Sequence, residues 1–167
     1  MSFRLRPYKE PDFETLWQID QRCFLPGVAY SKRELDLFLR RSGAVCLVAE
    51  EDGNEGKTLD SGNPDSGVNP HIFGFVIVHL HHQKATAHVI TIDVLSRARR
   101  LGVGTALMAA AEKRALDRSC TVMHLEAAVE NESALAFYAR HGYTIMRTVP
   151  DYYAPGAHAY TMTKPLA

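Results

Sequence analysis

The 167-residue sequence has little of what marks secreted or membrane proteins. Its three cysteines, Cys23, Cys46 and Cys120, cannot all pair and include no C-x-x-C spacing, so neither a disulfide framework nor a cysteine zinc site is indicated. The longest apolar run, residues 72–78, is far shorter than the roughly 20 residues that cross a bilayer. The N-terminal residues lack the apolar core of a signal peptide. We therefore expect a cytoplasmic protein with no membrane partner.

An excess of charge is also absent. Lys plus Arg and Asp plus Glu both total 19, which gives a formal net charge of zero. Because nucleic-acid binding usually needs a broad basic surface, we expect a small partner and no nucleic acid. A local exception is the run of Arg97, Arg99 and Arg100, which is either an ordinary solvated surface or a site that faces an anion.

Hydrophobic patterning predicts one domain over residues 1–167, in which strands alternate with helices. Segments that are rich in Val, Ile and Phe, or that alternate in polarity, predict strands at residues 3–6, 44–49, 71–80, 88–94, 122–128, 143–149 and 157–163. Apolar residues at helical spacing predict helices near residues 13 and 32 and at 104–118 and 132–141. A capping box, Ser31 to Glu34, marks the start of the second helix. This pattern indicates a mixed α/β sheet.

Two connections differ from the rest in composition. Residues 51–70 are crowded with Gly, Asn, Asp and Ser, which predicts a mobile insertion between two strands. A plain surface insertion and a functional lid are both open for this segment. Residues 24–30 are too apolar to form a simple solvent-facing linker, and we expect them to line a binding site.

A glycine-containing turn follows the strand predicted at residues 88–94. Gly102 and Gly104 stand where this turn becomes a helix, so that main-chain N–H groups and the positive end of the helix dipole point at one spot. Such a turn suits a pyrophosphate, although a lone G-x-G is more often an ordinary helix start. No Gly-Lys-Ser/Thr sequence follows, which argues against the phosphate loop of a nucleoside triphosphatase. The third glycine of the dinucleotide fingerprint is also missing, which argues against a dinucleotide-binding loop.

The residues around this turn resemble a known family. Residues 99–104, Arg-Arg-Leu-Gly-Val-Gly, resemble the R/Q-x-x-G-x-G/A coenzyme A signature of the GCN5-related N-acetyltransferases (GNAT). Other segments resemble the ribosomal-protein N-terminal acetyltransferases of the RimI type: Leu125-Glu126, Asn131 to Ala134, Phe137-Tyr138, Gly142-Tyr143, Tyr152-Tyr153 and Ala159 to Met162. These marks span residues 91–162, whereas the N-terminal half agrees in element order only.

The resemblance implies a single GNAT-like domain, with a mixed, mostly antiparallel sheet of about seven strands flanked by about four helices. It also implies acetyl-CoA as cofactor, with the main chain of strand 91–94 binding the pantetheine arm. The residues implied to bind the cofactor are Ile92, Val94, Arg99, Arg100, Leu101, Gly102, Val103, Gly104, Thr105, Asn131, Ser133 and Phe137. For Asn131 a helix N-cap is an equal alternative, and both roles are compatible.

Three side chains are candidates for proton transfer. Glu126 matches the family's general-base position, with a structural ion pair as the alternative. Tyr138 matches the tyrosine proposed to protonate the coenzyme A sulfur, and because it also shares an apolar helix face, core packing is its alternative. His88 corresponds to a tyrosine that some relatives use as a base, although strand-end histidines are usually only solvated.

Other reactive side chains carry no prediction of chemistry. His79, His81 and His82 suggest a metal cluster only superficially, because alternate strand residues face opposite sides and no carboxylate partner is apparent. We expect no metal. Cys23 precedes the apolar connection, but no base at a recognisable spacing would activate it, which favours an ordinary buried thiol.

The leading functional hypothesis is acetyl transfer to a peptide or protein N-terminal α-amine by direct attack. Phe24, Tyr30, Tyr152 and Tyr153 are the expected substrate-binding residues. His158 stands where several relatives carry an acidic residue, so the preferred first residues are expected to differ. Acetylation of a small amine or a lysine side chain is the alternative, and a non-catalytic coenzyme A-binding module is a third reading. The oligomeric state is left open between monomer and homodimer.

Overall fold

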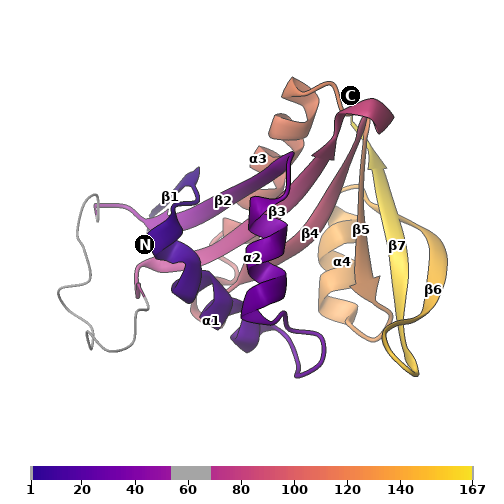
Figure 1. The fold of residues 1–167 in the computed structure, drawn as a ribbon, viewed down its shortest axis with the longest axis horizontal. Coiled ribbons are helices and arrows are strands. Elements are labelled where there is room, and N and C mark those ends of the chain that lie inside the picture. Colours follow the sequence, from indigo (N-terminus) through magenta and orange to yellow (C-terminus); the bar gives the residue numbers. More distant parts are fainter. Residues whose placement is uncertain (1, 54–68, 167) are drawn as a thin grey trace.

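The computed structural model describes residues 2–53 and 69–166, which form one seven-stranded sheet with helices on both faces (Figure 1). The strands are β1 (Phe3–Pro7), β2 (Ala44–Glu51), β3 (Ile72–His81), β4 (Thr86–Val94), β5 (Val122–Ala128), β6 (Thr144–Ala154) and β7 (Ala157–Pro165). The α-helices are α1 (Phe13–Cys23), α2 (Lys32–Arg40), α3 (Val103–Asp117) and α4 (Glu132–Arg140). The expected mixed, mostly antiparallel sheet with four helices is confirmed.

The sheet order is β1-β2-β3-β4-β5-β7-β6, and β4 with β5 is its parallel pair. That pairing is short, because its register runs only from Thr86 opposite Val122 to His88 opposite His124. Beyond these residues the two strands diverge, as Figure 1 shows. The main chain of the second half of β4 therefore has no ladder partner on the β5 side.

Two apolar cores cover the two faces of the sheet. Helices α1 and α2 bury Leu16 and Leu35 against Phe75 and Ile77 of β3. The larger core lies on the other face, where Leu107 and other residues of α3 pack on β2 to β5 together with part of α4. Alternation along β5 follows from this arrangement: Met123, Leu125 and Ala127 enter the larger core, and the side chains between them face the α1 and α2 side.

Local sequence signals account for the helix starts. Ser31 accepts a hydrogen bond from the Glu34 N–H, and the Glu34 carboxylate accepts one from the Ser31 N–H, so the predicted capping box is formed. Strand β6 differs more from expectation, because it continues past Pro150 to Ala154 with register shifts and so carries Tyr152 and Tyr153. Of the insertion predicted at 51–70, residues 54–68 lie outside the described part. None of the described helices is long and apolar enough to cross a membrane.

Candidate active site

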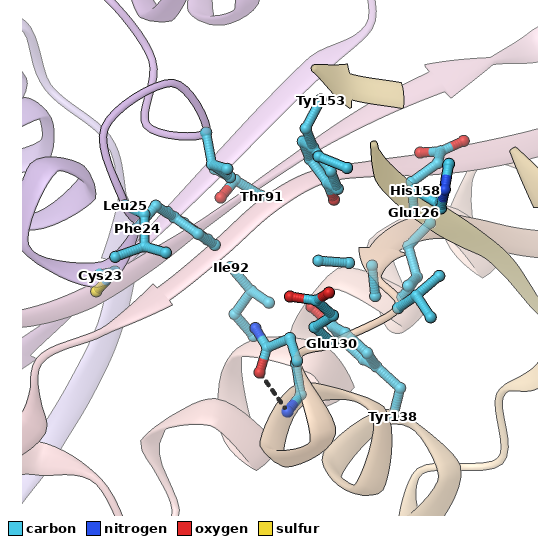
Figure 2. Close-up of a pocket in the computed structure, with 18 of the residues that line it drawn as sticks. Cys23, Phe24, Leu25, Thr91, Ile92, Glu126, Glu130, Tyr138, Tyr153 and His158 are labelled. Atoms are coloured by element: carbon cyan, nitrogen blue, oxygen red, sulfur yellow. Dashed lines mark hydrogen bonds between the residues drawn. The ribbon is translucent and has the colours of Figure 1, made fainter. Parts of the chain in front are cut away.

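A cavity of about 530 Å³ opens where β4 and β5 diverge. Figure 2 shows Phe24 and Leu25, from the connection between α1 and α2, on one side and Glu126 with His158 on the other. Tyr153 and Tyr138 point into the space between them (Figure 2). The residues predicted from the sequence that line it are Phe24, Tyr30, Ile92, Glu126, Asn131, Tyr138 and Tyr153.

A hydrogen bond joins two of the three proton-transfer candidates. His88 Nε2 lies 2.6 Å from Glu126 Oε2, and both side chains are partly buried. Burial alone would raise the pKa of Glu126, but the hydrogen bond from His88 and the positive charge of Arg147 lower it. An ionised carboxylate can only accept, so His88 Nε2 carries the proton and donates. Glu126 lines the cavity directly, whereas His88 lies beyond it.

Tyr138 meets the requirements of a proton donor. Its residue is 9% exposed, its ring packs edge-on against Phe137, and it lines the cavity. Burial raises the pKa of Tyr138 above its ordinary value, so the hydroxyl stays protonated at neutral pH. Within residues 2–53 and 69–166 no hydrogen bond holds this hydroxyl, which leaves it able to donate into the cavity.

The start of α3 fits an anion. Gly102 is the N-cap with φ of 82°, and no described side chain caps the helix. The N–H groups of Val103, Gly104 and Thr105 therefore have no partner within the helix. A Cβ at Gly102 would meet no atom within 4 Å, so the main chain here is open to a ligand. A pyrophosphate at this spot would receive these N–H groups and the positive end of the helix dipole.

The three arginines of this region separate in the structure. Arg97 donates to the carbonyl oxygens of Pro70 and Ile72 and lies over the Phe73 ring, so it is anchored in the fold. Arg99 Nε donates to the Val94 carbonyl oxygen at 3.1 Å, which places this guanidinium beside the end of β4. Arg100 is exposed. The side chains of Arg99 and Arg100 thus remain the candidates for contacting an anion.

The other predicted cofactor residues differ in their exposure and in their hydrogen bonds. Leu101 and Ser133 are exposed, whereas the Val103 side chain is buried in the core, so that only its main chain can face a ligand. Asn131 accepts a hydrogen bond from the Ala134 N–H, which establishes its N-cap role without testing the other one. The Thr105 hydroxyl lies 3.0 Å from the Nε2 of His141, the residue that follows α4, and the two are hydrogen-bonded.

A buried acid pair, Asp20 on α1 and Asp93 on β4, lies outside the cavity lining and was not predicted from the sequence. Asp20 on α1 is 0% exposed and accepts the Tyr30 N–H at 2.7 Å, while Asp93 on β4 is 1% exposed and accepts from Thr91. Burial and the neighbouring Asp20 carboxylate raise the pKa of Asp93 well above its usual value. Asp93 therefore keeps a proton that it shares with Asp20.

The remaining candidates have mainly structural contacts. Tyr30 donates to the Ile90 carbonyl oxygen at 3.3 Å, which ties the apolar connection to β4. Tyr152 is 46% exposed and packs edge-on against Tyr153. His79 bonds the Phe38 carbonyl oxygen. Burial raises the pKa of the Cys23 thiol to about 12, which argues against a nucleophilic thiolate.

The sequence matches the model of the acetyltransferase (GNAT) family over residues 13–143. The chain belongs to the GNAT family. An N-alpha-acetyltransferase of Sulfurisphaera tokodaii is 39% identical over 80 residues, 47% of this chain and 48% of the relative. One of Saccharolobus solfataricus is 36% identical over 80 residues, with the same coverage of 47% and 48%. The match spans about half the length of these curated relatives.

Solved structures share the GNAT fold over nearly the whole chain. Ard1 from Thermoplasma volcanium has a TM-score of 0.81 at 22% identity and covers 100% of this chain and 99% of its own. The ribosomal-protein-S18-alanine N-acetyltransferase from Escherichia coli has a TM-score of 0.79 at 17% identity, over 99% and 95%. These likenesses establish the fold.

GNAT acetyltransferases use acetyl-CoA, as the resemblance implied. The residues present fit this molecule: the uncapped start of α3 suits its pyrophosphate, and the edge of β4 around Ile92, which has no strand partner, suits the amides of its arm. Gly104 and Phe137 belong to the same wall, because a Cβ at Gly104 would lie 3.2 Å from the Phe137 ring.

Replacing Gly104 with Val is expected to weaken acetyl-CoA binding at least about tenfold, or roughly 1.4 kcal/mol, because its methyl groups would displace Phe137. Isothermal titration with acetyl-CoA measures this. Ala109→Val, at an exposed position of the same helix, is the control and should bind normally. Equal affinities for the two variants would remove Gly104 from the cofactor site.

Replacing Asp93 with Asn should change how stability depends on pH. A carboxyl whose pKa is higher in the folded than in the unfolded chain favours folding less as the pH rises above about 4. The variant cannot ionise, so its unfolding free energy relative to the native sequence should rise by about 1 kcal/mol or more from about pH 5 to about pH 9. Urea denaturation measures this, with exposed Asp52→Asn as the control. A pH-independent difference would contradict the shared proton.

Proposed function

We propose that this GNAT protein transfers acetyl from acetyl-CoA to the N-terminal α-amine of a peptide or protein by direct attack. The observation that carries the proposal is the His88–Glu126 hydrogen bond beside a cavity that also contains Tyr138. A coenzyme A-binding module without activity would not need a carboxylate and a phenol that face the same cavity. Acetyl-CoA supplies the acetyl group as a thioester.

Glu126 and His88 serve the acceptor amine. The amine must be neutral to attack, and the ionised Glu126 carboxylate, facing the cavity, takes its proton directly or through one water molecule. His88 holds that carboxylate in place by donating from Nε2. We therefore assign Glu126 as the principal base and His88 as the residue that supports it.

Tyr138 serves the leaving thiolate. Its hydroxyl, protonated because of burial, donates a proton to the sulfur as the bond to carbon breaks.

The acceptor enters from the side of Phe24 and Tyr30, opposite Tyr153, since these aromatic residues border the same cavity. The cofactor and the acceptor would thus approach from different faces of the sheet.

An α-amine suits this machinery better than a lysine side chain. Its pKa of about 7.7 to 8.0, against about 10.4 for lysine, makes the neutral nucleophile about 3 to 4 kcal/mol easier to obtain at pH near 7. A carboxylate is a weak base, so the more acidic ammonium group favours turnover. The similarity to two proteins named N-alpha-acetyltransferase supports the same acceptor.

A cytoplasmic location, and a monomer or homodimer as the oligomeric state, remain predictions from the sequence.

Peptides with a free α-amine are expected to be acetylated at least about 100-fold more efficiently than matched peptides that have a blocked N-terminus and one lysine, which follows from the difference in amine pKa. Mass spectrometry with acetyl-CoA and a short peptide library measures both rates. A preference for blocked lysine peptides or for free polyamines would favour the side-chain or small-amine alternative. Binding of acetyl-CoA without transfer to any of them would favour the non-catalytic module.

Tyr138→Phe keeps the ring and removes the proton. Turnover is expected to fall about 10²- to 10⁴-fold while acetyl-CoA affinity stays within about twofold, because the loss affects only the departing thiolate. Steady-state kinetics and a cofactor titration separate the two quantities. Unchanged turnover would leave Tyr138 with a packing role alone.

A further inference from the structure

The ring of His124 lies against the ring of His88. The two residues are opposite each other in the last described pair of β4 and β5, and their rings stack with centroids 4.4 Å apart and planes 11° apart. Glu126, two residues after His124 on the same face of β5, receives the His88 hydrogen bond. Three side chains thus form one row: His124 stacked on His88, and His88 bonded to Glu126.

The geometry of this row distinguishes between chemical roles. The ligand atoms of the three residues lie within 4.8 Å of one another, close enough to consider a metal ion. An imidazole nitrogen, however, binds a metal or a proton acceptor in the plane of its ring. Two nearly parallel rings 4.4 Å apart share no such point, so His124 and His88 neither chelate one ion nor hydrogen-bond to each other as they lie.

The role that remains for His124 is to hold the His88 ring. On the other side of His88, strand β3 places His79 opposite it, anchored to the Phe38 carbonyl oxygen. His88 therefore has a stacked ring on the β5 side that limits rotation about its side-chain bonds. Rotation would swing Nε2 away from Glu126 and leave a partly buried carboxylate without its donor.

The surroundings of His124 also favour its neutral form. Burial lowers the pKa of His124, and the nearby His88 and His81 lower it further, while Glu126 opposes them. Arg147 on β6 is the other charged group that acts on Glu126. A neutral His124 adds no positive charge beside His88, so the proton in this row stays between His88 and Glu126.

We infer that His124 is a positioning residue, whose ring stacks on His88 and thereby keeps His88 Nε2 directed at the Glu126 base. This inference rests on the proposed function of Glu126. It assigns His124 to no contact with acetyl-CoA or with the acceptor. Any flat ring at position 124 should therefore serve, and no titratable nitrogen is needed there.

The test compares His124→Phe, which keeps a ring, with His124→Ala, which removes it. With acetyl-CoA and a free α-amine peptide, His124→Ala should lower kcat about tenfold, since small displacements of a catalytic group are costly. KM for both substrates should stay within about twofold, and His124→Phe should retain most of kcat. His82→Ala, at an exposed histidine outside the row, is the matched control.

A spectroscopic measurement makes the test independent of activity. In protein with ¹⁵N-labelled histidine, the short His88–Glu126 bond should give a downfield Nε2–H resonance, assigned by its upfield shift in Glu126→Gln, whose neutral amide oxygen is a weaker acceptor. It should persist in His124→Phe and His82→Ala and weaken or vanish in His124→Ala. His124→Asn, polar and without a ring, replaces the alanine variant if that one does not fold, and should behave in the same way.

The outcomes separate the positioning role of His124 from its stacking contact and from the proposed function. A full resonance and full kcat in His124→Ala would overturn the positioning role. A His124→Phe variant as impaired as His124→Ala would overturn stacking as the cause, because it would show that the nitrogen atoms matter. If no peptide is acetylated by the native sequence, the proposed function fails, while the resonance still reports whether His124 holds His88.

Discussion

The divergence of β4 and β5 determines most of what this molecule can do. Two parallel strands that are hydrogen-bonded along their whole length would satisfy each other's main chain and leave no room between them. Here the ladder ends at His88 and His124, and beyond that point β4 has no strand partner, although the side chains of Tyr30 and Arg99 donate to two of its carbonyl groups. A cavity lies in the resulting gap, and the uncapped start of α3 follows at the end of the same strand.

The same strands divide the chemistry between the faces of the sheet. Strict alternation along β5 sends Met123 and Leu125 into the core and leaves His124 and Glu126 on the α1 and α2 side. The acid pair Asp20 and Asp93 then ties that side together, since Asp20 holds the connection before α2 and Asp93 lies on β4. The connection that borders the cavity is therefore tied to α1 through Asp20 and to β4 through Tyr30.

Local patterns in the sequence predicted the fold well. The features that they did not predict depend on contacts between residues that are distant in the sequence. The capping box at Ser31 and the turn at Gly102 depend on a few adjacent residues, so they can be read directly. The His88–Glu126 bond spans 38 residues and depends on the register of β4 and β5, which no local pattern specifies. Arg97 looked like part of one basic run, but the short helical turn at Ser96–Ala98 directs it onto Phe73. The Asp20–Asp93 pair gave no signal, because each residue alone resembles an ordinary surface acid.

A binding surface built from main chain, as we propose for acetyl-CoA, has an evolutionary consequence. The uncapped N–H groups at Val103 to Thr105 and the free edge of β4 depend on backbone conformation, so most side chains around them can be exchanged without loss of the surface. Gly102, with its left-handed conformation, and Gly104, which lies against the Phe137 ring, limit the choice strongly. Such a scaffold tolerates extensive sequence drift, which accords with superpositions at TM-scores of 0.79 and 0.81 between chains that share only 17% and 22% of their residues.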